Sequence, residues 1–308
     1  MRIIVTGGSG FIGSHVVDEL LAKNHEVRIY DLDTPRFKQQ CEFMRGDIRD
    51  IDRLSQAAKN TDAVYHLAAE ANVNRFFESP VFSNDITASG TLSVLEAARR
   101  AGGGPRVLLA STEWIYGTLA DAGDQQITEE TPYAQNPDHL YTSSKIAAEL
   151  FCKNYQRLYG VNFTIMRFGI PFGERARPET VTPIFIRKLL LGEPITIHGD
   201  GSQTRQFIYV KDLAGGIAAC LQSQAANEVF NLNGREQISV LAIVRTLESI
   251  MNTSARITFV DDRMGNFKGR FISSEKAKHV LHWEAVSRYK EAMTHYVQWY
   301  MEHQSKGR

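Results

Sequence analysis

Residues 3–15 read IIVTGGSGFIGSH, and this stretch decides the fold. The β-branched run at its start predicts a buried strand, and the apolar periodicity that follows predicts a helix. Gly7, Gly10 and Gly13 lie between the two, where glycines allow a tight turn and a close backbone approach to a pyrophosphate. Backbone N–H groups at the start of the helix would then bind the phosphates. The strand–glycine–helix context predicts a dinucleotide-binding site at this turn.

Strand and helix patterns continue to alternate along the first half of the chain. Further strands are expected at 26–31, 42–46, 62–67, 106–111 and 161–168, and long helices at 81–101 and 140–158. Such alternation predicts an α/β fold with a Rossmann-type doubly wound parallel sheet. After Gly169 the strand–helix alternation is replaced by a connecting segment that is rich in Pro and Arg. We expect an NAD-binding domain at 1–170 with a return segment at about 207–232. A smaller C-terminal substrate-binding lobe is expected at 171–206 and 233–308.

Composition excludes several classes of partner. The chain has 35 Lys and Arg residues and 35 Asp and Glu residues, so it carries no net charge that would attract nucleic acid or a membrane. Cys41, Cys152 and Cys220 lie far apart without metal-ligand spacing, which favours reduced thiols and no metal site. The first apolar run is shorter than a signal peptide requires, and no stretch approaches the ~20 apolar residues of a membrane span. We therefore expect a cytoplasmic protein.

Two acidic residues follow expected strands and are candidates for the adenosine end of the cofactor. Asp31 can accept hydrogen bonds from both ribose hydroxyls and would repel a 2′-phosphate, which favours NAD over NADP. Arg36 is close enough in sequence to bind a 2′-phosphate, so NADP is not excluded. Asp47 either binds the adenine amino group or caps the next helix.

The segment YTSSK, 141–145, places Tyr141 and Lys145 four residues apart on an expected helix. This spacing puts both side chains on one face, about 6 Å apart at their base. A neighbouring ammonium lowers the pKa of a phenol, so Tyr141 can remove a proton from a substrate hydroxyl. Ser111 ends the expected 106–111 strand and Thr112 follows it. We favour Thr112 as the hydroxyl that assists Tyr141 and expect Ser111 to be structural.

Five motifs together resemble one known family. They are TGGSGFIGSH at 6–15, HLAA at 66–69, ASTEWIYG at 110–117, YTSSK at 141–145 and GEPITIHGDGSQTRQFIYVKDLA at 192–214. The chain resembles the extended short-chain dehydrogenase/reductases, specifically the NAD-dependent nucleotide-sugar epimerase/dehydratase group, over nearly its whole length. The resemblance implies that Thr112, Tyr141 and Lys145 are catalytic. The NAD-binding set it implies is Gly7, Gly10, Phe11, Ile12, Gly13, Asp31, Asp47, Ile48, Leu67, Ala68, Ala69, Tyr141 and Lys145.

The same resemblance implies a nucleotide-diphosphate sugar as the substrate, held in a cleft between the lobes. Arg205 matches the family position that binds the substrate pyrophosphate, and a guanidinium suits this role because it binds phosphate bidentately. Arg270 is a second phosphate candidate, and Val181 matches a position that often contacts the base. The family also often forms homodimers through the helices at 88–101 and 141–158, so we expect a homodimer.

The reaction depends on the two residues after Thr112. In the sugar 4,6-dehydratases of the family that this chain resembles, these two residues are an acid and a base, whereas here they are Glu113 and Trp114. An indole cannot accept a proton, so we rank 4-epimerisation first: the keto-sugar turns over and is reduced on its other face. Glu113 still allows a dehydratase, because it can serve as a general acid or base, hydrogen-bond a sugar hydroxyl, or pair with an arginine. A non-catalytic NAD-binding regulator and a simple reductase remain alternatives.

Overall fold

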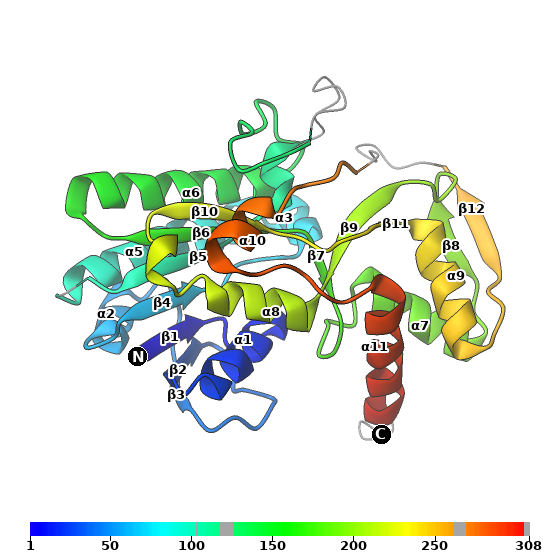
Figure 1. The fold of residues 1–308 in the computed structure, drawn as a ribbon, viewed down its shortest axis with the longest axis horizontal. Coiled ribbons are helices and arrows are strands. Elements are labelled where there is room, and N and C mark those ends of the chain that lie inside the picture. Colours follow the sequence, from blue (N-terminus) through cyan, green and yellow to red (C-terminus); the bar gives the residue numbers. More distant parts are fainter. Residues whose placement is uncertain (103, 118–125, 262–268, 305–308) are drawn as a thin grey trace. The chain divides into compact units, whose positions relative to one another are not determined.

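The computed structural model describes residues 1–102, 104–117, 126–261 and 269–304. Its central feature is a seven-stranded sheet in the order β10-β6-β5-β4-β1-β2-β3, with every neighbouring pair parallel (Figure 1). The strands are β1 (Arg2–Thr6), β2 (Glu26–Asp31), β3 (Glu42–Arg45), β4 (Ala63–His66), β5 (Arg106–Thr112), β6 (Phe163–Phe168) and β10 (Glu228–Leu232). The strand order reverses between β1 and β4, which is where doubly wound sheets bind ligands. The predicted fold class is confirmed.

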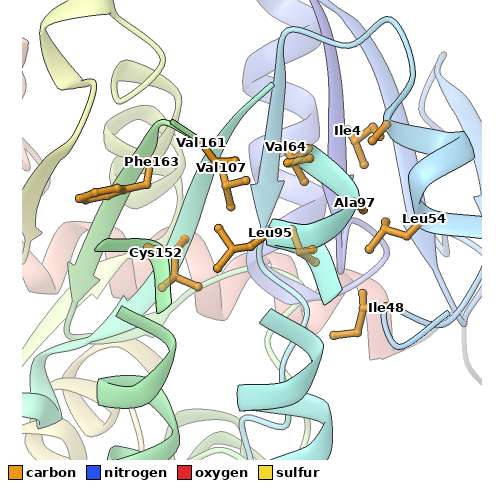
Figure 2. Packing of buried hydrophobic residues seen from close by; sticks show 14 of the residues in the cluster. Ile4, Ile48, Leu54, Val64, Leu95, Ala97, Val107, Cys152, Val161 and Phe163 are labelled. Atoms are coloured by element: carbon orange, nitrogen blue, oxygen red, sulfur yellow. The ribbon is translucent and has the colours of Figure 1, made fainter. Parts of the chain in front are cut away.

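Helices cover both faces of this sheet. On one face, α2 (Ile51–Ala58), α5 (Gly90–Arg100) and α6 (Leu140–Tyr159) bury one cluster of apolar side chains against alternate strand residues (Figure 2). The opposite strand residues, such as Ile3 and Val5, are equally buried, and α1 (Phe11–Ala22) contacts β1 and β2. Burial on both faces explains why the central strands β1 and β5 are nearly continuous apolar runs rather than alternating ones.

The chain divides into two compact units. The first comprises 1–168, 214–232 and 274–284, and the second comprises 169–213, 233–273 and 285–308. The sequence prediction placed all of 233–308 in the smaller lobe, but α10 (Glu275–Leu281) contacts β10 in the first unit. Lys276 there pairs with Glu228 at 2.8 Å. A seven-residue helix has too little periodicity to be recognised from sequence.

The second unit is smaller and is built on short strands. β7 (Ile170–Phe172) is parallel to β9 (Thr204–Tyr209), which pairs antiparallel with β11 (Gln237–Ser239). β8 (Ile195–His198) and β12 (Ile257–Val260) form a separate parallel pair. Its helices are α7 (Val181–Leu191), α9 (Val240–Met251) and α11 (Tyr289–Gln304). The α9 helix contacts both α7 and α11.

The helix expected at 81–101 contains a π-helical turn. It is described as α4 (Pro80–Asn84), a π-helical segment at Asp85–Ser89 and α5, all with right-handed helical backbone angles at their junctions. The Gly90 N–H reaches back to the Asp85 carbonyl, which is the i→i+5 bond of a π turn. Such turns often lie at functional sites. The short helices α3 (Val73–Glu78) and α8 (Val210–Ala219) complete the fold, and no helix of the described residues is long and apolar enough to cross a bilayer.

Candidate active site

The glycine turn between β1 and α1 has the backbone that a pyrophosphate requires. Gly7 has a φ of +72°, and a Cβ there would meet the Ala68 nitrogen at 2.7 Å. A Cβ on Gly13 would meet the Gly7 carbonyl oxygen at 2.1 Å. Gly10 is the N-cap residue of α1 and has no side chain that could accept a hydrogen bond from the first N–H groups of the helix. Phe11 and Ile12 form the first turn of α1.

The two acidic candidates have different partners. Asp31 ends β2, and its Oδ2 accepts a hydrogen bond from the Ser9 N–H at 3.0 Å, which fixes the carboxylate beside the glycine turn. Asp47 accepts hydrogen bonds from the Arg49 backbone N–H and guanidinium, and this pairing lowers the pKa of Asp47. The alternative role of Asp47 as a helix N-cap is wrong, because Asp50 caps α2 by accepting from the Arg53 N–H.

Ile48 and the segment at 67–69 border the same edge of the sheet. Ile48 is buried against Gly90 of α5, where a Cβ would come within 2.6 Å of the Ile48 side chain. Leu67, Ala68 and Ala69 follow β4, and the Leu67 N–H donates to the Thr6 carbonyl. The post-β4 segment therefore lies directly against the glycine turn.

Thr112, Glu113 and Trp114 lie where β5 ends. Thr112 is the last residue of β5, and its Oγ1 accepts a hydrogen bond from the Trp114 N–H at 3.3 Å. Glu113 begins a one-turn 3₁₀ helix and is 9% exposed, so its carboxylate is largely removed from bulk water. The Trp114 ring packs edge-on against Tyr141, with ring centroids 6.3 Å apart, and against His139 at 5.1 Å.

Tyr141 lies in the first turn of α6 and Lys145 one turn later. Phe76 also packs edge-on against the Tyr141 ring, at 5.7 Å, so aromatic groups hold this ring on two sides. Lys145 is 5% exposed and its Nζ donates to the Ala110 carbonyl at 2.9 Å, which docks α6 on β5. Burial lowers the pKa of Lys145 to about 8, although the Glu149 carboxylate opposes this shift.

A buried ion pair beneath this site was not recognised from the sequence. Glu149 is fully buried and accepts a bidentate pair of hydrogen bonds from Arg167 on β6. Ser111 also donates to Glu149, which agrees with its expected structural role. The signal was present, because Glu149 follows Lys145 by one helical turn, but nothing in the sequence pairs it with Arg167. This network fixes β5, β6 and α6 relative to one another.

The substrate candidates belong to the second unit. Val181 begins α7 and Arg205 lies in β9, where its Nη1 donates to the Thr204 carbonyl at 2.7 Å. Gly269 packs against β9, since a Cβ there would meet the Thr204 carbonyl oxygen at 2.4 Å. The next residue, Arg270, has a buried Nη1 with no hydrogen-bond partner among the described residues. The structure thus brings Arg270 beside Arg205, and a buried guanidinium nitrogen without an acceptor suits an anionic ligand.

Among the described residues, no three His, Cys, Asp or Glu side chains are grouped as ligands for a metal ion. The first unit instead fits a dinucleotide. Its glycine turn admits no Cβ at positions 7 and 13, and the N-terminus of α1 lacks a side-chain cap. Both features match the space and the hydrogen-bond donors that a pyrophosphate needs.

Comparisons with known proteins agree with this geometry. The NAD dependent epimerase/dehydratase family matches residues 3–233. A putative UDP-glucose 4-epimerase from Methanocaldococcus jannaschii is 33% identical over 96% of this chain and 97% of its own length. The structure is also similar to UDP-glucose 4-epimerase from Thermotoga maritima with UDP-glucose, with a TM-score of 0.91 and 27% identity over 99% of this chain and all of that one.

A dehydratase structure is equally similar. A double mutant of dTDP-glucose 4,6-dehydratase from Streptomyces venezuelae, with NAD bound, has a TM-score of 0.90 and 29% identity, covering 99% of this chain and 98% of its own. These similarities therefore do not distinguish an epimerase from a dehydratase. The family match and the NAD-bound relative agree on the cofactor predicted at the glycine turn. The chain belongs to the NAD-dependent epimerase/dehydratase family of nucleotide-sugar enzymes, and its cofactor is NAD.

Proposed function

We propose that this protein is a nucleotide-sugar 4-epimerase. The observation that carries the proposal is the contact between Trp114 and Tyr141, whose rings lie edge-on at 6.3 Å. An indole beside the proposed catalytic phenol can neither donate nor accept the protons that elimination of water requires. Epimerisation needs only one group that removes a proton from a sugar hydroxyl and later returns it.

When bound, NAD supplies a hydride acceptor and, once reduced, a hydride donor. Tyr141 takes the proton of the sugar 4-hydroxyl and gives it back after the keto-sugar has turned over. Thr112 hydrogen-bonds the same oxygen, and the Lys145 ammonium stabilises the phenolate by its charge. Docking of Lys145 on Ala110 holds that charge close to the end of β5.

The remaining candidates bind rather than react. Gly7, Gly10 and Gly13 bind the NAD pyrophosphate, with Asp31 on the adenosine ribose. The other proposed NAD contacts are Phe11, Ile12, Asp47, Ile48, Leu67, Ala68 and Ala69. Arg205 and Arg270 bind the pyrophosphate of the nucleotide sugar, which is supported by the buried Nη1 of Arg270, for which the described residues offer no hydrogen-bond partner. Val181 contacts the base.

A dehydratase is the second candidate, and Glu113 favours it. Its side chain is buried in the turn directly after Thr112. A carboxylate shielded from water can act as an acid or base. Elimination of water would require Glu113 to exchange a carbon-bound proton with solvent. Epimerisation moves only the hydrogen at C4 and leaves the hydrogens on the other carbons in place.

The two reactions are separated by incubation in D₂O with UDP-, GDP-, CDP- and dTDP-hexoses, followed by NMR of the products. We expect the C4 epimer without deuterium on carbon. A 6-deoxy-4-keto or unsaturated product, or deuterium at C5, would overturn the proposal. Tyr141→Phe should lower turnover about 10³-fold while NAD stays bound. The matched control Tyr159→Phe, at the exposed end of the same helix, should remain active.

We also propose that the protein is a homodimer formed through α4–α5 and α6. Exposed apolar side chains support this surface, with Val81 82% and Leu158 62% exposed. Ala148 of α6 is fully buried in the core of the first unit and cannot contribute to this interface. Sedimentation that shows only monomer at micromolar concentration would exclude the dimer.

A further inference from the structure

His66 is the last residue of β4 and a buried histidine to which the proposed reaction assigns no role. It is 2% exposed and lies between two hydroxyl side chains. Its Nδ1 is 2.9 Å from the Thr6 Oγ1 and its Nε2 is 3.1 Å from the Thr91 Oγ1. The imidazole therefore bridges the end of β1 to helix α5.

The partners of these hydroxyls determine which nitrogen carries hydrogen. Thr91 donates its only hydroxyl hydrogen to the Thr87 carbonyl at 2.7 Å, so it must accept from His66 Nε2–H. Burial and the nearby Lys145 ammonium lower the pKa of His66 to about 3, so the ring is neutral and has one N–H. Nδ1 then accepts from the Thr6 hydroxyl, whose oxygen accepts from the Ala68 N–H at 3.4 Å.

These bonds converge on the post-β4 segment that borders the glycine turn. Ala68 is held by Thr6 on one side and lies in van der Waals contact with Gly7 on the other. Two residues later, the Glu70 N–H donates to the Thr87 Oγ1 at 3.2 Å. Thr87 belongs to the π-helical segment, and its carbonyl is also the acceptor for Thr91. One continuous set of hydrogen bonds thus joins the end of β1, the post-β4 segment and the π turn, and the post-β4 segment packs against the glycine turn.

We propose that His66 is a positioning residue for the NAD site: as a neutral imidazole that donates through Nε2 and accepts at Nδ1, it fixes residues 67–69 against the glycine turn. The role requires a donor and an acceptor on opposite edges of one planar side chain. Phenylalanine keeps a planar ring, although a larger one, but has neither a donor nor an acceptor, and it would leave the Thr6 and Thr91 hydroxyls without their partner. The inference rests on NAD binding alone and does not depend on which sugar reaction follows.

The test compares NAD affinity in protein stripped of cofactor, measured by calorimetry well below each variant's melting temperature. We expect NAD to bind His66→Phe at least tenfold more weakly and Thr91→Val about fivefold more weakly, because each loses buried hydrogen bonds. Thr91→Ser keeps the hydroxyl and should bind within twofold of the unmodified protein.

Thr164→Val is the matched control for a general loss of stability. Thr164 is fully buried in the same unit and donates to the Ala225 carbonyl at 2.6 Å. This variant should melt at a lower temperature and yet bind NAD within twofold of the unmodified protein. Equal NAD affinity in His66→Phe and in the unmodified protein would overturn the proposal, and so would a loss in Thr164→Val as large as that in Thr91→Val.

Nitrogen-15 NMR of the histidine ring provides a readout in the unmodified protein. We expect His66 to carry its hydrogen on Nε2 and to show no titration between pH 5 and 9. A ring with hydrogen on Nδ1, or one that titrates in this range, would contradict the hydrogen-bond assignment. Neither NAD affinity nor the NMR spectrum involves a nucleotide sugar, so this test can fail while the proposed epimerase activity stands.

Discussion

The two units present their candidate residues in different ways. In the first unit, the proposed cofactor region consists of backbone: Gly7 and Gly13 exclude any Cβ, and Ala68 packs against Gly7. In the second unit, the proposed substrate region consists of long side chains, Arg205 on β9 and Arg270 beside it. A backbone site is fixed by the fold itself, whereas a guanidinium site can be altered while the backbone stays intact.

This difference predicts that damage to the two regions has different consequences. Changes at the glycine turn should displace main chain and abolish cofactor binding. Changes at the arginines should weaken substrate binding and leave the cofactor in place. Three substitutions or titrations separate these outcomes, and the first has the largest expected effect.

Gly13→Ala should reduce NAD affinity about 100-fold or more. The new methyl would lie 2.1 Å from the Gly7 carbonyl oxygen and 2.8 Å from the Gly8 Cα, both backbone atoms, so the turn must move. Overpacking against well-packed atoms costs about 1–3 kcal/mol and sometimes more. The measurement is the NAD content of the purified protein, followed by titration with NAD.

Gly215→Ala in α8 is the control for this change. It is also a helical glycine, but its nearest neighbour would be the Trp283 Nε1 at 3.9 Å, an ordinary contact. NAD affinity should be unchanged there. If Gly13→Ala retained NAD as tightly as Gly215→Ala, the glycine turn would not be the pyrophosphate site.

Arg270→Gln should raise the KM for the nucleotide sugar about 30-fold, with kcat changed less than twofold. A hydrogen bond from a charged group contributes about 1.5–3 kcal/mol, and Gln cannot bind phosphate bidentately. Bound NAD should be unaffected. Arg245→Gln, which breaks an exposed pair with Glu248 on α9, should leave KM unchanged. A normal KM in Arg270→Gln would remove Arg270 from the phosphate site.

The sequence was most informative where function depends on local spacing. The glycine turn and the pair Tyr141–Lys145 each occupy a few consecutive residues with one possible geometry, a strand-to-helix turn and one helical turn. The proposed roles of these residues remain predictions, but the structure places the residues on the elements that the sequence predicts.

Features that depend on distant residues were not predictable. Glu149 pairs with Arg167 from a neighbouring strand, and Arg270 meets β9 across more than sixty residues of sequence. The π turn at Asp85–Ser89 has no sequence pattern of its own. Its Thr87 hydroxyl accepts a hydrogen bond from the Glu70 N–H, and its Thr87 carbonyl accepts one from the Thr91 hydroxyl. The contact with Glu70 forms only after folding. Local patterns identify elements, whereas tertiary contacts decide their irregularities.

The smallest expected effect is a pH dependence that separates the two regions within the unmodified protein. Lys145 is buried, and burial lowers its pKa to about 8. A lowered pKa means that the amine becomes neutral as the pH rises through about 8, so the charge proposed to stabilise the phenolate is mostly present at pH 7 and mostly absent at pH 9. The rate of sugar oxidation, followed as absorbance of reduced NAD in stopped flow, should fall about tenfold over this range.

Arginines stay protonated throughout this range, so the KM for the nucleotide sugar should remain constant between pH 7 and 9. Lys153→Met, at an exposed position two turns further along α6, should retain the same pH profile, because that ammonium contacts Tyr133 rather than β5. Lys145→Met should be slow at every pH and lose the fall. A rate that stays flat from pH 7 to 9 in the unmodified protein would show that the Lys145 ammonium is not the charge on which catalysis depends. A KM that rose as the rate fell would show instead that deprotonation of Lys145 also weakens substrate binding.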